Sequence, residues 1–382
     1  MIAFVQPFGL HESGGSTRIL RSLLQGEHPP TLSLYTGPSQ VAPSPGLEEI
    51  HIPLRPGFGR LEWTRFRNHL RIFEGVFRSR FEARLRKVIR EREIKLLHII
   101  PHAYDIVPVC RVAAELNIPY FLNVHDVLEY TSMGHPLMKQ MVETLGHAWR
   151  NARGVFVISD EMGKQYSARF GERQYEIITD GLTKTANAPL TRPARSLRVY
   201  FMGLFHYRYA ANFRAVLDAL KSIRGQYPDW DISVTCRCGS IFGEVKQDDV
   251  PVTVLPFASE SEVEKDMLSA DVLYQPLPFE SEAVNFGKFS LSTKMVTYLG
   301  SGLPIFYHGP EDSAACRLLA GNDAALICTT LDPEVIASQI VEAIMRRETI
   351  VENALQLART RFMLVDQQRR FWQPIESALT AL

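Results

Sequence analysis

Short runs of apolar residues alternate with amphipathic segments along most of the chain, and this alternation predicts its secondary structure. The run at residues 2–5 is followed by a turn with Gly and Ser at residues 13–16 and then by apolar positions between 19 and 24 that repeat with a helical period. Strand, short turn and helix in this order are typical of an α/β unit. The further runs that we expect to form strands are residues 96–100, 120–124, 154–158, 175–178, 197–202, 231–235, 271–275 and 303–307.

The segments between these runs predict helices, because their apolar residues return every three or four positions. Ser159 and Asp160 stand where a helix begins after one of the strands, and either side chain suits an N-cap. The main helices expected on this basis cover residues 107–116, 136–150, 211–223 and 292–300, and helices dominate from residue 332 to the end.

One segment, residues 183–196, interrupts the alternation with Thr, Lys, Ala, Asn, Pro, Arg and Ser and few large apolar residues. We therefore place a linker there, between two domains. The predicted fold class is α/β, with two doubly wound Rossmann-like domains that face each other across a cleft. The domains expected are 1–182, 197–360 and a helical tail, 361–382, that packs back toward the N-terminal domain.

Composition and charge narrow the function classes. The 382 residues suit two or three domains, and 46% apolar residues are ordinary for a soluble protein. The 42 basic and 42 acidic residues cancel, so we expect no nucleic-acid partner. The five cysteines favour a reducing cytoplasm over a disulfide framework, and we expect neither a signal peptide nor a membrane-spanning helix. Cys236 and Cys238 are too close together for a zinc knuckle, and we expect no metal site.

One stretch departs from this neutral balance. Residues 55–95 contain 13 Arg or Lys and five Glu, a local excess of eight positive charges, with six interleaved aromatic residues. A basic, aromatic helical stretch can lie on an anionic membrane surface. The alternative is that the aromatic rings pack into the domain and the basic side chains are solvated. Both interpretations stay open from the sequence.

A series of short segments, in an order that extends over nearly the whole chain, carries a resemblance to a known family. The segments are Gly14-Gly15, Asn123–Asp126, Val157–Ser159, Ile178–Gly181, Phe201–Leu204, Ala270–Leu273, Ser292–Lys294 and Tyr298–Pro304. The chain resembles the nucleotide-sugar glycosyltransferases of the GT-B fold, specifically the family-four type. This resemblance implies transfer of a sugar from a nucleoside diphosphate, usually with retention at the anomeric carbon. The donor would be of the UDP, GDP or dTDP type, with no further cofactor.

The resemblance and the chemistry of a diphosphate together point to a donor site. A departing diphosphate gains negative charge, which backbone N–H groups at a helix start and nearby cations can stabilise. The N-terminal domain is then the acceptor side and the C-terminal domain binds the nucleotide sugar. The residues expected to bind the diphosphate are Gly14, Gly15, Gly203, Arg208, Lys288, Ser292, Thr293 and Lys294.

Two positions depart from the family pattern. The family usually has two glutamates, eight residues apart, before the Gly-x-Pro turn, and here these positions hold Phe289 and Thr297. Thr297 is the expected contact to the ribose. Glu280 and Glu282, in the preceding loop, are the expected substitutes near the nucleoside and the sugar.

His125 is the candidate for the reacting centre. It follows a predicted strand, and ligands of α/β sheets bind at the carboxyl ends of strands. In similar enzymes this histidine contacts the donor sugar. Asp126 either orients His125 or caps the next helix.

The sequence thus predicts a metal-independent glycosyltransferase acting on a glycan or lipid-linked acceptor, as in cell-surface polysaccharide synthesis. The predicted location is cytoplasmic, with residues 55–95 able to hold the protein peripherally at the inner membrane face. The alternatives are a non-catalytic module of the same fold that binds a glycan or another partner, and a nucleotide-sugar epimerase.

Overall fold

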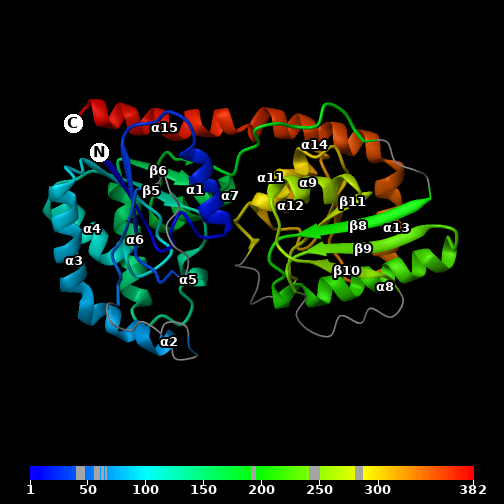
Figure 1. Ribbon diagram of the computed structural model, residues 1–382, viewed down its shortest axis with the longest axis horizontal. Coiled ribbons are helices and arrows are strands. Elements are labelled where there is room, and N and C mark those ends of the chain that lie inside the picture. The colour runs from blue at the N-terminus through cyan, green and yellow to red at the C-terminus, as the bar shows by residue number, and fades with distance from the viewer. Residues whose placement is uncertain are drawn as a thin grey trace. The chain divides into compact units, whose positions relative to one another are not determined.

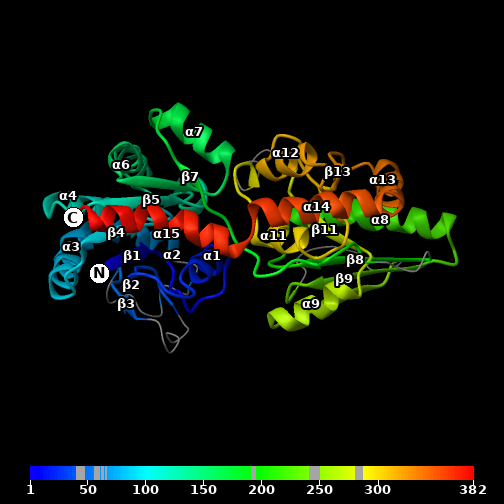
Figure 2. The same ribbon diagram turned by 90° about the horizontal axis from the view of Figure 1, so that it is seen from above.

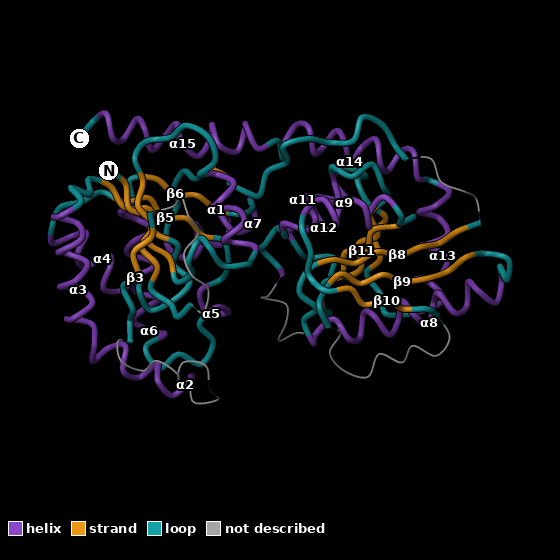
Figure 3. The backbone as a smooth tube through the Cα atoms, viewed as in Figure 1, coloured by secondary structure: helices purple, strands orange, loops and turns teal. Residues whose placement is uncertain are grey.

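The computed structural model describes residues 1–39, 48–55, 61, 64, 67–190, 195–240, 250–279 and 287–382 (Figure 1). These residues group into two compact units. The first consists of Met1–Asp180 with Leu364–Leu382, and the second of Gly181–Met363. Each unit contains a parallel β-sheet with helices packed around it (Figure 3).

The sheet of the first unit has seven strands in the order β3-β2-β1-β4-β5-β6-β7, with parallel neighbours throughout. Strands β1, β4 and β5 are buried along their whole length. Helices cover both faces of such a sheet, so its central strands read as unbroken apolar runs. The strands are β1 (Ile2–Gln6), β2 (Thr31–Tyr35), β3 (Glu49–His51), β4 (Leu96–Ile99), β5 (Tyr120–Val124), β6 (Gly154–Val157) and β7 (Glu176–Ile177).

The C-terminal helix α15 (Leu364–Thr380) belongs to this unit and runs alongside α1 (Gly15–Leu23), as Figure 2 shows. Trp372 Nε1 donates a hydrogen bond to the carbonyl oxygen of Leu23, at 2.9 Å. Gln368 Nε2 donates to the carbonyl oxygens of Ser22 and Gln25. The other helices are α2 (Arg67–Leu70), the 3-10 helix η2 (Arg71–Phe73), α3 (Glu74–Glu91), α4 (Ile106–Glu115), α5 (Leu128–Thr131), α6 (Met138–Asn151) and α7 (Asp160–Phe170).

The sheet of the second unit has six parallel strands in the order β10-β9-β8-β11-β12-β13. The strands are β8 (Ser196–Met202), β9 (Asp231–Arg237), β10 (Val252–Leu255), β11 (Val272–Pro276), β12 (Ile305–His308) and β13 (Leu326–Cys328). The helices are η3 (Tyr207–Tyr209), α8 (Ala210–Gln226), α9 (Glu260–Leu268), α11 (Thr293–Leu299), α12 (Ala314–Gly321), α13 (Pro333–Met345) and α14 (Arg347–Arg361).

The segment after Gly181 is attached to the second unit by backbone hydrogen bonds. Leu182 N donates to Phe362 O, Ala186 N to Gly300 O and Leu190 N to Gly302 O, at 2.7 to 2.9 Å. Gly302 has a φ of +80°, and a Cβ there would lie 2.8 Å from the Cβ of Ala186. Glycine is therefore needed at 302 for both its conformation and this close approach.

Each sheet has one point where the order of its strands reverses. Ligand-binding sites are expected at such points in doubly wound folds. In the first sheet, β2 and β3 lie on one side of β1, and β4 lies on the other. In the second sheet, β9 and β10 lie on one side of β8, and β11 lies on the other. Ligands of open α/β sheets bind beyond the carboxyl ends of the strands at such points. The predicted fold class, two α/β units with doubly wound parallel sheets, is confirmed.

Candidate functional site

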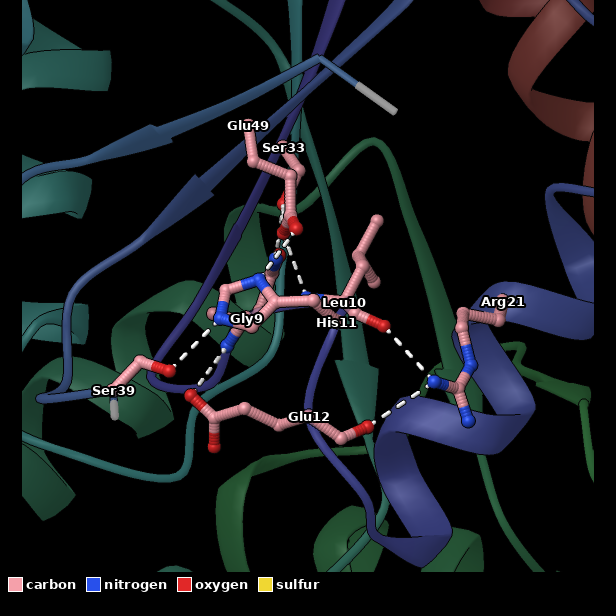
Figure 4. A network of polar contacts seen from close by, with 9 residues as sticks. Gly9, Leu10, His11, Glu12, Arg21, Ser33, Ser39 and Glu49 are labelled. Atoms are coloured by element: carbon pink, nitrogen blue, oxygen red, sulfur yellow. Dashed lines mark hydrogen bonds and ion pairs between the residues drawn. The ribbon is translucent and has the colours of Figure 1, made fainter. Parts of the chain in front are cut away.

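Buried polar contacts fix the loop that follows β1 (Figure 4). Glu49, on β3, accepts a hydrogen bond from Leu10 N at 2.7 Å, and its other oxygen lies 2.7 Å from His11 Nδ1. The side chains of Glu49 and His11 are both 0% exposed. Ser33 Oγ donates to the same carboxylate, and Ser39 Oγ lies 2.8 Å from His11 Nε2. A buried carboxylate is tolerated only with such partners, so the network anchors the loop to β3.

Helix α1 fixes the same loop from its other side. Arg21 Nη1 donates to the carbonyl oxygens of Leu10 and Glu12, at 3.2 Å each, as Figure 4 shows. A Cβ at Gly9 would lie 2.2 Å from the ring of His11, so the ring packs directly on this glycine. The loop therefore leads into Gly14 by a fixed path.

Gly14 and Gly15 begin α1 and are exposed. Gly14 is the N-cap, has an extended backbone with φ 163° and provides no side-chain cap. The backbone at this turn is thus open to a ligand. One helical turn on, Arg18 Nε pairs with Asp180 Oδ2 at 2.9 Å, and Asp180 is buried at the end of the first unit. This ion pair ties the start of α1 to the residue at which the two units join.

His125 lies at the carboxyl end of β5, where the sequence places it, and is 3% exposed. Its ring packs edge-on against His102, with ring centroids 5.9 Å apart. His102 follows β4, the strand beside β5, and its ring is 6.2 Å from that of Phe8 in the loop after β1. Three loops at the strand ends therefore bring aromatic rings together.

Burial determines the charge of these histidines. It lowers the pKa of His125 well below the usual value, and His102 and His98 lower it further. Burial also lowers the pKa of His102, with Asp126 partly opposing the shift. Both rings are therefore neutral near pH 7, and each has one donor and one acceptor nitrogen. Such groups suit hydroxyls better than anions.

Asp126 is half-buried and follows His125 directly. The next helix, α5, has Val127 at its N-cap and no side-chain cap. The N-cap position is therefore one residue beyond Asp126, and the two roles expected for Asp126 stay predictions. Its charge acts on His102, whose pKa it raises against the effect of burial.

In the second unit, Gly203 ends β8 with a φ of +99°, a conformation that favours glycine. No atom lies within 4 Å of where its Cβ would be, so this backbone is open. Arg208, in η3, is half-buried, and its Nε donates to the hydroxyl of Tyr207 at 3.1 Å. Its guanidinium lies beside the Tyr207 ring, 5.6 Å from the centroid.

The expected phosphate loop contributes side chains that already have partners. Ser292 is the N-cap of α11, and its hydroxyl accepts from Met295 N at 3.2 Å and from Gln275 Nε2 at 3.3 Å. Thr297 Oγ1 donates to the carbonyl oxygen of Thr293 at 3.1 Å. Lys288 Nζ pairs with Asp312 Oδ2 at 2.6 Å, and both side chains keep solvent contact. The Ser292 hydroxyl is thus used to begin the helix, and Lys288 is partly neutralised.

Lys294, on α11, is a half-buried cation of this unit. Its ammonium lies over the ring of Phe201, 4.2 Å from the centroid, and 5.5 Å from that of Tyr209. Burial lowers the pKa of Lys294 to about 7, while Cys236 and Cys238 act in the opposite direction. Phe201 lies on β8, two residues before Gly203.

The remaining predictions concern two glutamates, a metal site and a membrane-spanning helix. Glu280 and Glu282 lie outside the described residues. In the described ranges, no group of three or more His, Cys, Asp or Glu could hold a metal ion. No helix in the part of the chain that the structure describes has both the length and the apolar character needed to cross a bilayer.

Sequence reasoning missed three acidic residues that shape these sites. Glu49 contacts His11 across 38 positions of sequence, and no local signal links the two. Asp105 is buried beside Thr36, whose hydroxyl donates to it at 2.7 Å, and burial raises the pKa of Asp105 to about 7. Asp312 is the partner of Lys288. A buried acid at the start of α4 (Asp105) could be suspected only from its place after a predicted strand.

No family model matches the sequence, and no curated protein matches it. Solved structures do match in three dimensions. HepE of Anabaena in complex with UDP has a TM-score of 0.67 at 17% identity, with 100% of both chains covered. The complex of HepE with UDP-glucose has a TM-score of 0.64 at 17% identity, covering 100% of this chain and 99% of that one.

A trehalose-phosphate synthase is also similar in fold. The UDP-forming enzyme of Burkholderia xenovorans, in complex with glucose-6-phosphate, has a TM-score of 0.65 at 11% identity, with 98% and 99% coverage. At sequence identities of 11% to 17%, structural similarity of this kind establishes the fold alone. The chain therefore has the two-unit GT-B fold of these glycosyltransferases over its whole length, and the resemblance expected from the sequence is confirmed at that level.

Proposed function

We propose that the chain is a glycosyltransferase that moves a sugar from a nucleoside-diphosphate sugar to an acceptor. One observation carries the proposal: the fold matches HepE, a protein with structures in complex with UDP and UDP-glucose, over the full length of both chains. The positions of His125 and Gly203, directly after β5 and β8, and of Lys294 over the ring of Phe201 on β8 support it.

The second unit would hold the nucleotide diphosphate. The open backbone at Gly203 allows a phosphate to approach without a Cβ in the way. Lys294 and Lys288 would supply positive charge as the diphosphate departs, which is the main electrostatic task in this reaction. Thr293 and Arg208 would add contacts, and Glu280, Glu282 and Thr297 are proposed to contact the nucleoside or the sugar. In this proposal no metal takes part.

The first unit would hold the sugars. His125, a neutral imidazole at a strand end, suits a sugar hydroxyl, and Asp126 tunes the charge of its surroundings. Gly14 and Gly15 would let the acceptor or the diphosphate approach the backbone of the fixed loop. We propose retention at the anomeric carbon, with the leaving phosphate taking the acceptor proton, so that no dedicated base is required.

The acceptor is proposed to be a glycan or a lipid-linked sugar, as in polysaccharide synthesis at the cytoplasmic face of a membrane. The basic stretch that includes α3 supports this choice, because an anionic membrane would attract it.

The experiment that tests the function is calorimetric titration of the whole protein with UDP, GDP, dTDP and ADP, with and without EDTA. We expect micromolar binding of one of these nucleotides, indifferent to EDTA, which would also identify the base of the donor. Binding that EDTA abolishes would contradict the role given to the lysines. Binding of none would favour the non-catalytic module.

Conversion of the matching nucleotide sugar in the absence of any acceptor would favour an epimerase instead. We expect no such conversion. Transfer of radiolabelled sugar to a lipid extract or to a soluble glycan mixture would then separate the two acceptor classes.

A further inference from the structure

An exposed group of apolar side chains lies where α3 begins. We name the "apolar apex" the residues Ile72, Phe73, Val76 and Met133, which are 61%, 40%, 72% and 57% exposed. The first three belong to η2 and the first turn of α3, and Met133 follows α5. Figure 1 shows α2 and the start of α3 at the edge of the first unit opposite to α15.

The two segments of the apolar apex are held together by specific contacts. Arg71 Nη1 donates to the carbonyl oxygen of Met133 at 3.0 Å. His135 Nε2 lies 2.8 Å from Glu74 Oε2, and both residues are buried. The polar groups next to the apolar apex thus form hydrogen bonds with each other, while its apolar side chains remain exposed.

The packing of α3 does not need these side chains. The helix is anchored through Phe81, Leu85 and Ile89, which are 4% exposed or less and recur every four residues. Val76 is on another face. Single exposed apolar residues are ordinary, but a cluster next to charged side chains marks an interaction surface.

Positive charge continues along the same face of the helix. Val76 is followed by Arg80, Arg84 and Lys87 at intervals of four, four and three residues, and all are exposed. Residues at this spacing form one stripe on a helix. Lys87 has Glu91 as a partner at 3.6 Å, in an exposed pair.

Of the three acidic residues of α3, Glu74 and Glu82 are buried, whereas Glu91 is exposed and pairs with Lys87. Glu82 is 5% exposed and lies within 3.2 to 3.6 Å of Arg78, Arg86 and Arg111. Glu74 is 5% exposed and pairs with Arg55. The outward face therefore has apolar groups at one end, Arg80 and Arg84 along its length, and the Lys87–Glu91 pair at its far end.

We propose that the apolar apex and the stripe Arg80-Arg84-Lys87 dock on an anionic lipid surface. Such a surface accepts both parts at once, because apolar side chains enter the boundary of the acyl chains while basic side chains contact the phosphate headgroups. A few apolar residues flanked by cations give reversible binding at the surface. The inference deepens the proposed function by naming the surface on which a lipid-linked acceptor would be met.

The test is sedimentation of the full chain with vesicles of phosphatidylcholine alone and of phosphatidylcholine mixed with phosphatidylglycerol. We expect binding to the mixed vesicles that salt weakens, and little binding to phosphatidylcholine. Val76→Asp should weaken binding about fivefold or more, since it places a negative charge at the apex. Arg80→Glu with Arg84→Glu should weaken it about 25-fold or more, because each basic residue near the surface contributes about fivefold.

The matched control is Val365→Asp on α15, where the valine is 68% exposed and far from the apex in sequence. It should bind vesicles as the unchanged protein does. The proposal is overturned if neither vesicle binds, if both bind equally, or if Val365→Asp weakens binding as much as Val76→Asp. Size-exclusion chromatography adds one more arm, since self-association that Val76→Asp abolishes would assign the apex to a second copy instead.

Vesicle binding does not require transfer. A protein that binds mixed vesicles but none of the four nucleotides would retain this inference and lose the proposed function. A protein that binds a nucleotide but no vesicle would retain the proposed function and lose this inference.

Discussion

At the strand ends of the first unit two buried histidines, His125 and His102, pack against each other, whereas in the second unit a half-buried lysine, Lys294, lies over the ring of Phe201. In both places burial disfavours the charged form of a base and lowers its pKa. The consequences differ because the starting values differ. The histidines become neutral throughout the physiological range, while Lys294, with a pKa of about 7, remains charged in part.

The difference assigns a different ligand chemistry to each unit. Neutral imidazoles exchange hydrogen bonds with hydroxyls, and an ammonium attracts phosphate. Bound phosphate would favour the charged form of Lys294, so the site would gain its charge when the ligand arrives. Under the proposed function the first unit contacts the sugars and the second the diphosphate, so variants in each should affect different measurements.

The largest expected effect is that of His125→Ala. Transfer should fall by about a hundredfold or more, as for loss of a preorganised group at a reacting centre. Nucleotide affinity should stay within about twofold, because Lys294 and Gly203 belong to the other unit. Initial rates of sugar transfer and calorimetric titration of the nucleotide measure the two quantities.

The control for this variant is His147→Ala, which replaces an exposed histidine on α6. It should leave both quantities unchanged. His125→Ala with full activity would remove His125 from the reacting centre. Equal loss of transfer and nucleotide binding would show instead that His125 also contributes to nucleotide binding.

Lys294→Met should have the second-largest effect, this time on the nucleotide. Its affinity should fall about ten- to hundredfold, the usual contribution of a hydrogen bond to a charged group. The unchanged protein should bind more weakly as the pH rises above about 7, because Lys294 loses its proton there. Titrations between about pH 6 and pH 8.5 should show this slope, and Lys294→Met should lack it.

Stability should have the opposite dependence on pH. An unfolded chain keeps the proton on lysine up to its usual pKa of 10.5, whereas the folded chain releases it near 7. Between these values the unfolded state binds more protons, so folding stability rises with pH. Lys265→Met, on an exposed lysine of α9, is the control and should change neither profile. A pH slope that survives in Lys294→Met would belong to another group.

The fold could be predicted at several central strands that are buried on both faces. The run at residues 154–158 becomes β6, and 120–124 becomes β5, because unbroken apolar residues leave little alternative to a central parallel strand. The strand β2 is buried as well, but Ser33 interrupts its apolar run and the sequence does not predict it. The strands β3, β10 and β13 could not be found in this way either. They lie at sheet edges and are partly exposed, so their residues alternate too little to signal a strand.

The candidate sites could be predicted where they depend on strand ends and not where they depend on distant pairs. His125 and Gly203 directly follow apolar runs, and they also belong to the segments that carry the family resemblance. The contact between Glu49 and His11 joins segments that only the folded sheet brings together. Packing also decides which polar group is already engaged, as with the Ser292 hydroxyl at the start of α11.

A smaller effect is expected from Gly14→Ala in the first unit. The extended backbone of Gly14 suits any residue, and a new Cβ would meet only Thr17 Oγ1, at 3.6 Å. The fold should therefore be kept, or gain about 0.4–1 kcal/mol from the lower entropy of the unfolded chain. Transfer should fall about fivefold if a ligand approaches this backbone closely, an effect of about 1 kcal/mol.

Gly26→Ala is the contrasting control for that variant. Gly26 has a φ of +84° and open space around it, so alanine there should strain the backbone without touching the site. Thermal unfolding and transfer rates together separate the two cases. Gly14→Ala that leaves the rate unchanged would remove this turn from the ligand's path.

The smallest effect concerns Lys288, which shares its charge with Asp312 in a partly solvated pair. Asp312→Asn should strengthen nucleotide binding about twofold by releasing the lysine, and Lys288→Ala should weaken it about as much, because such exposed pairs contribute little. Added salt should erase both changes. If Asp312→Asn strengthens binding equally in the Lys288→Ala background, the two residues are not coupled. The positive charge that contacts the diphosphate in the second unit would then come from Lys294 and not from Lys288.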